Sequence, residues 1–283
     1  MTTSTLGQNT AQVNARPKVL GRAQYAGDLK LPGMLHGKVL RSPHARARIR
    51  SIDTRAARAL PGVKAVVTGD DAPGTRWGVS HKDRHILAKG QVRFCGEEVA
   101  AVAAVSEDIA LDALDLIRVE YEEEPALLDP ELALADGAAQ VHAGHDNVSH
   151  RIRYHRGDVD AALAQAAVVH EARYSTHPQY AGYLEPMATV AMLDADGRLQ
   201  VWASTQSVFL ARARLAAALE WPVSRIRFIA PSVGGGFGAK IIEERGCRRN
   251  LLFVHVELID DDLLDALFDG FLVSHFAKIE RET

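Results

Sequence analysis

The residues best suited to chemistry in this chain form a glycine-rich segment, residues 233–240, which we call the glycine loop. Four glycines surround one aromatic side chain: Gly234, Gly235, Gly236, Phe237 and Gly238. Glycine lets the backbone come close to a bound group, because no Cβ stands in the way. Residues 224–230 predict a strand just before the loop. The glycines are therefore expected in a turn whose N–H groups can point at a ligand.

Three interpretations of the glycine loop follow from its residues alone. A phosphate-binding Walker loop requires Gly-Lys-Ser/Thr, and Ala239-Lys240-Ile241 disfavours it. A dinucleotide-binding turn fits the pattern Gly234-x-Gly236-x-x-Ala239 and an acidic residue, Asp260, about twenty positions later. The helix that such a turn requires would be short, because Gly246 interrupts it. A tight turn without any ligand is the third possibility.

Other groups that could do chemistry have simpler interpretations. Four histidines fall across a predicted loop and strand without ligand spacing: His142, His145, His150 and His155. Glu243 and Glu244 suit a solvated helix face, and Glu185 suits a structural hydrogen-bonding group better than a base. From these residues we assign no catalytic residue and no metal ligand.

Composition narrows the class of protein. The 283 residues are 47% apolar, which is enough for one large domain or two ordinary ones. A net charge of −3 with scattered lysines and arginines disfavours a nucleic-acid partner and leaves small molecules and proteins. A polar N-terminus and the absence of a long apolar run predict neither a secretory signal nor a membrane span. Two cysteines are too few for a four-thiolate iron–sulfur cluster, and a reducing cytoplasm fits best.

Two units are predicted to carry these residues. Residues 1–17 are polar and predict a flexible N-terminus. Strands and short helices then alternate, which indicates an α+β domain over 18–127; its predicted strands are 33–40, 45–52, 63–68, 98–105 and 119–125, and its helices are 53–60 and 106–116. The apolar run 98–105 predicts a strand buried on both faces.

A linker is predicted over residues 128–150, and a second unit begins at about residue 151. Its predicted strands are 168–174, 187–193, 199–203 and 224–230, and its predicted helices are 158–165 and 208–219. Residues 195–197, Ala-Asp-Gly, predict a hairpin turn. The character changes after residue 244. In the tail, a strand is possible over 251–258, and Asp260 begins a predicted amphipathic helix.

The second unit resembles the molybdenum hydroxylases, the large subunit of the xanthine dehydrogenase and aldehyde oxidase family. Three segments carry the resemblance: Tyr-Leu-Glu-Pro at 183–186, Trp-Ala-Ser-Thr-Gln at 202–206, and the glycine loop about thirty residues later. The first unit is similar to the a/b hammerhead domain of the same family at residues 25–35, 41–45 and 96–102. The resemblance covers about residues 18–244.

The resemblance implies a molybdopterin-type molybdenum cofactor. In the family, a Gln in the Ser-Thr-Gln motif hydrogen-bonds an oxygen ligand of molybdenum through its amide, and Gln206 matches it. Phe237 and Gly238 match a Phe-Gly pair that packs beside the metal. Gly234, Gly235 and Gly236 would let backbone N–H groups approach the metal and the pterin.

The resemblance also implies a reaction and partners. The family hydroxylates an aldehyde or an electron-poor N-heterocycle, with the cofactor supplying the chemistry. Electrons leave through iron–sulfur and flavin centres, so an iron–sulfur subunit and an FAD-binding subunit are the expected partners, beside a small-molecule substrate. Some members place a substrate-contacting Glu where this chain has Ile241, which disfavours a purine.

The family's catalytic Glu lies near the far C-terminus of a longer subunit and is not in this sequence. We therefore expect residues 151–244 to form a partial molybdopterin-binding domain and 245–283 an atypical tail. Two alternatives remain open. One is a catalytically silent, truncated or frame-shifted fragment that retains little molybdenum, because the missing walls of a site normally bury most of a ligand. The other is a Rossmann-type nicotinamide-binding protein.

Overall fold

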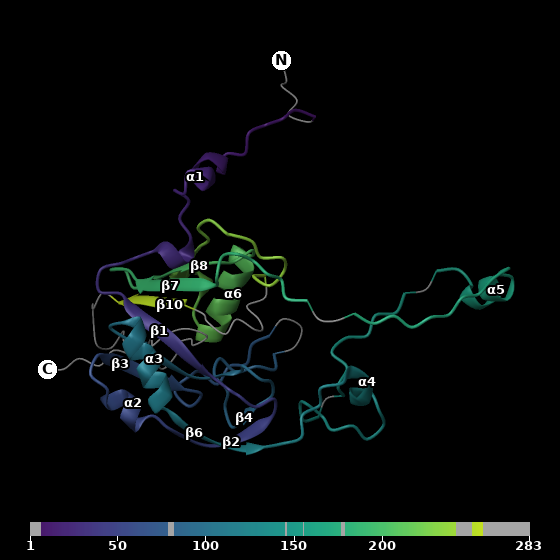
Figure 1. Ribbon diagram of the computed structural model, residues 1–283, viewed down its shortest axis with the longest axis horizontal. Coiled ribbons are helices and arrows are strands. Elements are labelled where there is room, and N and C mark those ends of the chain that lie inside the picture. Colours follow the sequence, from purple (N-terminus) through teal and green to yellow (C-terminus); the bar gives the residue numbers. More distant parts are fainter. Residues whose placement is uncertain are drawn as a thin grey trace. The chain divides into compact units, whose positions relative to one another are not determined.

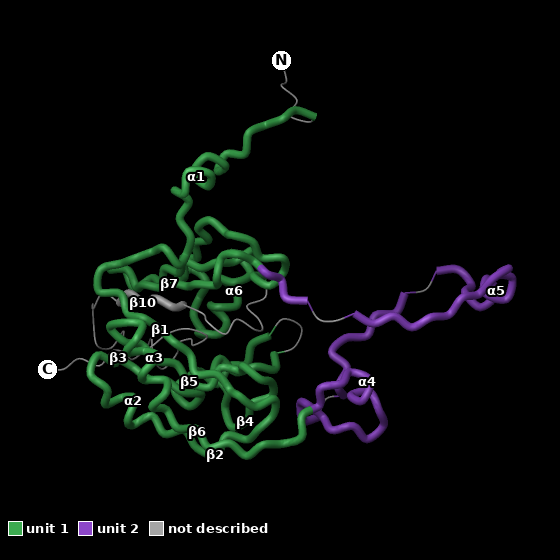
Figure 2. Tube along the Cα trace, in the orientation of Figure 1, with its two compact units in different colours: residues 1–126, 183–283 green, residues 127–182 purple. Residues whose placement is uncertain are grey.

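The computed structural model describes residues 7–78, 82–144, 146–154, 156–176 and 179–241, together with the backbone of 251–256. The chain divides into two compact units (Figure 2). Unit 1 comprises residues 1–126 and 183–283, and unit 2 comprises residues 127–182. The predicted tail helix that begins at Asp260 lies outside the described residues.

Unit 1 contains two sheets, and all of its longer helices pack on the larger one (Figure 1). The strands are β1 (Leu35–Arg41), β2 (Ala47–Asp53), β3 (Val63–Thr68), β4 (Gln91–Val92), β5 (Glu98–Ala104), β6 (Arg118–Glu123), β7 (Ala188–Leu193), β8 (Leu199–Ala203), β9 (Ile226–Ile229) and β10 (Leu251–Val256). The helices are α1 (Ala15–Val19), α2 (Arg55–Ala59), α3 (Glu107–Leu116) and α6 (Val208–Leu219), with 3-10 turns η1 (Ala26–Asp28) and η2 (Val223–Arg225). The α+β class predicted from the sequence is confirmed.

The larger sheet has seven strands in the order β3-β5-β1-β10-β7-β8-β9. Strands β3, β5 and β1 are antiparallel, and β7 and β8 form the predicted hairpin. The backbone of β10 joins these two groups, because it pairs antiparallel with β1 and parallel with β7. The strand considered possible over 251–258 is therefore present, and it lies inside the sheet.

Strand β5 shows how the sheet is buried. Successive side chains of a strand point to opposite faces. Ala100, Val102 and Ala104 pack in one core with residues of α2 and α3. Ala101 and Ala103 belong to a second core that contains residues of β7, β8 and α6. The prediction of a strand buried on both faces is confirmed.

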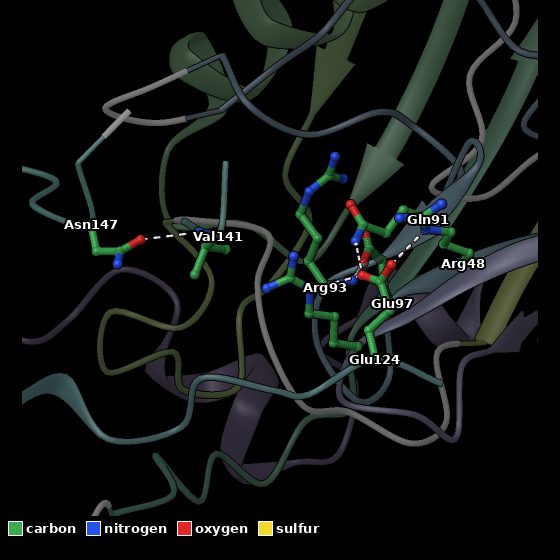
Figure 3. Close-up of polar contacts among 8 residues, drawn as sticks. Arg48, Gln91, Arg93, Glu97, Glu124, Val141 and Asn147 are labelled. Carbon is green, nitrogen blue, oxygen red and sulfur yellow. Dashed lines mark hydrogen bonds and ion pairs between the residues drawn. The ribbon is translucent and has the colours of Figure 1, made fainter. Parts of the chain in front are cut away.

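The smaller sheet, β4-β2-β6, carries its charge on paired side chains. Strand β6 is an edge strand, and just beyond it Glu124 accepts hydrogen bonds from Arg46 and Arg48. Gln91 donates to the same carboxylate (Figure 3). Acidic side chains on an edge strand discourage the addition of a further strand.

Glu97 is a buried carboxyl beside this sheet, with 5% of its surface exposed. It accepts a hydrogen bond from the N–H of Arg93 at 2.5 Å (Figure 3). Burial raises the pKa of Glu97 above its usual range, against the opposing effects of that N–H and of the Arg93 and Arg84 charges. The folded state therefore binds this proton more tightly than the unfolded state does.

Replacing Glu97 with glutamine is expected to change how stability depends on pH. Because its folded-state pKa is raised, the stability that Glu97 contributes is fully present below its unfolded-state pKa of about 4.3 and is lost as the pH rises through the folded-state pKa. Glutamine can keep the hydrogen bond from Arg93 but does not titrate. In urea unfolding, the stability of Glu97→Gln relative to wild type should therefore increase from about pH 4 to about pH 7. A difference in stability between Glu97→Gln and wild type that does not change with pH would contradict this.

Unit 2 contains two short helices, α4 (Pro130–Ala133) and α5 (Val159–Ala164), and its other described residues form no helix or strand. Asp158 caps α5 by accepting a hydrogen bond from Ala161 N at 2.9 Å, as the predicted helix at 158–165 required. Asn147 holds the segment before it by accepting from Val141 N at 3.0 Å (Figure 3).

The predicted strand at 168–174 is wrong. The described residues of this segment form no strand, and Val168 and Tyr174 are exposed. Its pattern of apolar residues suits a strand, but a strand also needs a neighbour to satisfy its backbone N–H and C=O groups. None of the described strands pairs with it.

In the described ranges, no helix is long and apolar enough to cross a membrane.

Candidate functional site

The candidate site lies where two parallel strands of the larger sheet end. β8 and β9 run in the same direction, with Trp202 opposite Ile229 near their carboxyl ends. Helix α6 lies between them in the chain, because two adjacent parallel strands need a long crossover connection. Residues 204–206 follow β8, and the glycine loop follows β9. Both segments therefore leave the sheet at the same place, beyond the carboxyl ends of these two strands. In open sheets with parallel strands, ligands usually bind beyond the carboxyl ends.

Gln206 is in direct contact with the glycine loop. Its side-chain Oε1 accepts a hydrogen bond from Gly238 N at 3.1 Å, and its backbone N–H donates to the carbonyl of Lys240 at 3.0 Å. Thr205 Oγ1 donates to the same carbonyl at 3.0 Å. The oxygen Oε1 of Gln206 is thus used as an acceptor within the protein. The remaining polar group of this side chain is the amide nitrogen Nε2, which can only donate. Within the described part of the chain it has no protein acceptor, and the residue is exposed.

Two glycines of the loop leave space that protein atoms use. A Cβ on Gly236 would lie 2.3 Å from Gln206 Oε1, and a Cβ on Gly234 would lie 2.6 Å from Glu185 Cβ. The N–H of Gly234 donates to Glu185 Oε2 at 2.6 Å. Its N–H is thus used by the protein, which differs from the expectation that it approaches the cofactor. The N–H groups of Gly235 and Gly236 have no acceptor among the described residues.

Phe237 stands out at the tip of the loop. It is the only described non-glycine residue besides Glu220 with positive φ, at 48°. A side chain in this left-handed region costs about 1 to 2 kcal/mol. Phe237 is also 75% exposed, so burial of its ring within this chain does not offset that cost. An exposed aromatic ring in a strained turn suits contact with a further group.

Lys240 and Glu185 form a buried ion pair that the sequence analysis did not predict. Lys240 Nζ lies 2.7 Å from Glu185 Oε2, and the two side chains are 0% and 8% exposed. The hydrogen-bonding role expected for Glu185 is confirmed. A signal was present in the sequence, since a lysine close to glycines and apolar residues needs an acidic partner if it is buried. The pairing also makes Lys240 unavailable to a phosphate.

Among the residues that the structure describes, the remaining candidates form no second site. The described ranges contain no group of three His, Cys, Asp or Glu side chains that could hold a metal ion. His145, His155, Glu243 and Glu244 lie outside the described residues. Residues 237–241 form turns rather than the start of a helix, which a dinucleotide-binding glycine turn would require.

Comparison with known protein families matches each half of the chain to a family domain. Residues 20–125 match the aldehyde oxidase and xanthine dehydrogenase a/b hammerhead domain. Residues 141–247, which contain Gln206 and the glycine loop, match the molybdopterin cofactor-binding domain. The chain thus contains the two adjacent domains of a molybdenum-binding subunit. It belongs to the xanthine dehydrogenase and aldehyde oxidase family of molybdenum hydroxylases, of which it holds an N-terminal portion of the large subunit.

Individual relatives agree with this family. The chain is 39% identical over 254 residues to the nicotinate dehydrogenase large molybdopterin subunit of Eubacterium barkeri, covering 89% of this chain and 59% of that one. It is 36% identical over 240 residues to the carbon monoxide dehydrogenase large chain of Afipia carboxidovorans, covering 78% and 30%. The structure of quinoline 2-oxidoreductase from Pseudomonas putida 86 matches with a TM-score of 0.73 at 36% identity, covering 83% and 31%. The chain therefore spans only part of these relatives.

The residues of the site fit a molybdenum–pterin cofactor. The donor set consists of one exposed amide and backbone N–H groups, which suit the oxygen atoms of such a group and need no titration. At Gly238 no protein atom lies within 4 Å of an added Cβ, so the loop is open to a further group there. The one negative charge in contact with the loop among the described residues, that of Glu185, is paired with the ammonium of Lys240.

Proposed function

We propose that this chain forms one wall of the cofactor site of a molybdenum hydroxylase that acts on an aldehyde or an N-heterocycle. Gln206, Gly235, Gly236, Phe237 and Gly238 are the proposed cofactor-binding residues. Gly234, which the sequence analysis also expected to bind the cofactor, is instead proposed to hold the loop through Glu185. The observation that carries the proposal is the hydrogen bond from Gly238 N to Gln206 Oε1, which joins residues 32 positions apart. It leaves the N–H₂ group of the exposed Gln206 without an acceptor among the described residues.

The chain's own residues would bind and orient the cofactor. When bound, the molybdenum group supplies the oxygen-transfer and hydride-accepting chemistry. Gln206 Nε2 would donate a hydrogen bond to an oxygen atom of that group, and Phe237 would pack against it and exclude water. The hydrogen bond between Gly234 N and Glu185 would hold the loop in place. None of these residues needs to move a proton, so we assign no catalytic residue to this chain.

The proposed partners follow from the same chemistry. Electrons removed from a substrate must leave the site, and two cysteines cannot hold a four-thiolate iron–sulfur cluster. We propose that an iron–sulfur subunit and an FAD-binding subunit accept them in the cytoplasm. The nicotinate and quinoline enzymes among the relatives support an N-heterocycle as substrate class.

Gln206→Leu tests the proposed role of the amide. Full-length chain is co-produced with the proposed partner subunits in a bacterium that makes the cofactor, and molybdenum is measured by mass spectrometry after purification. Loss of one hydrogen bond to a charged acceptor is expected to weaken cofactor binding by about tenfold or more. Gln200→Leu, which changes the same residue type on β8, should load like wild type. Equal loading of both variants, or no molybdenum in wild type, would contradict the proposed function.

A further inference from the structure

Glu185 contacts both ends of the glycine loop. Its carboxylate Oε2 accepts hydrogen bonds from Gly234 N at 2.6 Å and from Lys240 Nζ at 2.7 Å. Its backbone N–H donates to the carbonyl of Gly234 at 3.2 Å, and its own carbonyl accepts from Lys240 Nζ at 3.0 Å. One residue therefore binds both the first part of the glycine loop, at Gly234, and its last residue, Lys240.

The charges of this contact are shielded from water. The Lys240 side chain is 0% exposed and that of Glu185 is 8% exposed. The ammonium of Lys240 also lies 4.7 Å from the centre of the Tyr183 ring. A buried pair is screened by salt much less than a surface pair. Breaking it would leave an uncompensated charge inside the protein, so it restrains the loop more strongly than a surface contact would.

The restraint continues from Lys240 to Gln206. The carbonyl of Lys240 accepts hydrogen bonds from Gln206 N at 3.0 Å and from Thr205 Oγ1 at 3.0 Å. Gln206 in turn accepts from Gly238 N. A displacement of Lys240 would therefore move the backbone that carries the Gln206 amide. Glu185 acts on this amide through Lys240 and does not touch it.

We propose, on the basis of the function proposed above, that Glu185 is a positioning residue that sets the glycine loop and Gln206 in their binding geometry before the cofactor arrives. Preorganisation of this kind strengthens binding because the cost of ordering the loop is met during folding. The role differs from that of a catalytic base. Oxygen Oε2 of Glu185 is already committed to Gly234 and Lys240, and its buried Oε1 has no hydrogen-bond partner among the described residues.

Amide hydrogen exchange in the cofactor-free, full-length chain tests this directly. Selective labelling of glycine with ¹⁵N reports Gly234 at the Glu185 contact, Gly238 at the Gln206 contact and Gly37 within β1. In Glu185→Ala, exchange at Gly234 should accelerate by about tenfold or more, because one charge-assisted hydrogen bond is lost. Exchange at the amide of Gly238 should also accelerate, whereas the exchange rate at Gly37 should change less. Glu171 is an exposed glutamate in unit 2, and Glu171→Ala is the matched control. It should change none of the three glycine exchange rates.

A double variant separates positioning from stability. Glu185→Leu with Lys240→Met removes both charges together, and such a replacement of a buried pair is often neutral or stabilising. We expect near-wild-type thermal unfolding, yet fast exchange at Gly234 and at least about tenfold less molybdenum in the co-produced complex. Wild-type exchange at Gly234 in Glu185→Ala, or wild-type molybdenum loading in the double variant, would overturn the proposal. If wild type loads no molybdenum while Gly234 and Gly238 respond as expected, the proposed function fails and the positioning of the loop stands.

Discussion

Gly236→Ala is expected to reduce molybdenum loading by about tenfold or more while leaving the fold intact. The added Cβ would lie 2.3 Å from Gln206 Oε1 and 2.4 Å from Gln206 Cδ. Gln206 is exposed, so its side chain can move away at low cost. That movement takes the amide out of the position in which Gly238 N holds it. The variant therefore loses the proposed cofactor contact through displacement of a neighbour.

The stability of Gly236→Ala should change by less than about 1 kcal/mol, because the lower entropy of the unfolded chain offsets the local shift. Molybdenum content in the co-produced complex and urea unfolding of the free chain measure the two effects separately. Gly74→Ala is the control, since no atom lies within 4 Å of its added Cβ. If both variants load molybdenum equally, Gln206 does not contact the cofactor as proposed.

Lys240→Met is expected to destabilise the chain by about 3 to 5 kcal/mol. The substitution leaves the Glu185 carboxylate buried without its cation, and the penalty for an unpaired buried charge is large. Methionine has a similar length, so the loss comes from charge rather than from an empty space. The free energy of unfolding from urea titration followed by circular dichroism gives the size of the effect.

Lys38→Met provides the matched comparison for Lys240→Met. Lys38 is also a mostly buried lysine in an ion pair, but its partner Glu107 is 44% exposed. Water can solvate that carboxylate after the lysine is lost, so the expected cost is about 1 kcal/mol. Equal losses for the two variants would show that burial of Glu185 is not what makes its ion pair important.

Much of the fold could be predicted because its patterns are local. The alanine-rich segment 208–219 has the composition of a helix, and α6 has these limits. The apolar run at 98–105 is too continuous for an exposed strand, and β5 is buried on both faces. The segment 168–174 has an equally good local pattern but forms no strand. The difference is the partner strand, which the residues of the segment itself do not contain.

For the site, the sequence by itself determined the residue types and their order along the chain. The glycine loop, the Trp-Ala-Ser-Thr-Gln segment and the Tyr-Leu-Glu-Pro segment resemble the family, and the hammerhead segments of the first unit agree with them. Only the tertiary structure decided which groups of the site are used by the protein and which have no protein partner among the described residues. Parallel pairing of β8 and β9 brings the two segments together at one edge, and burial then joins Lys240 to Glu185. Hydrogen bonds and ion pairs form between groups that are close in space, and residues 185, 206 and 240 become neighbours only when the sheet has formed.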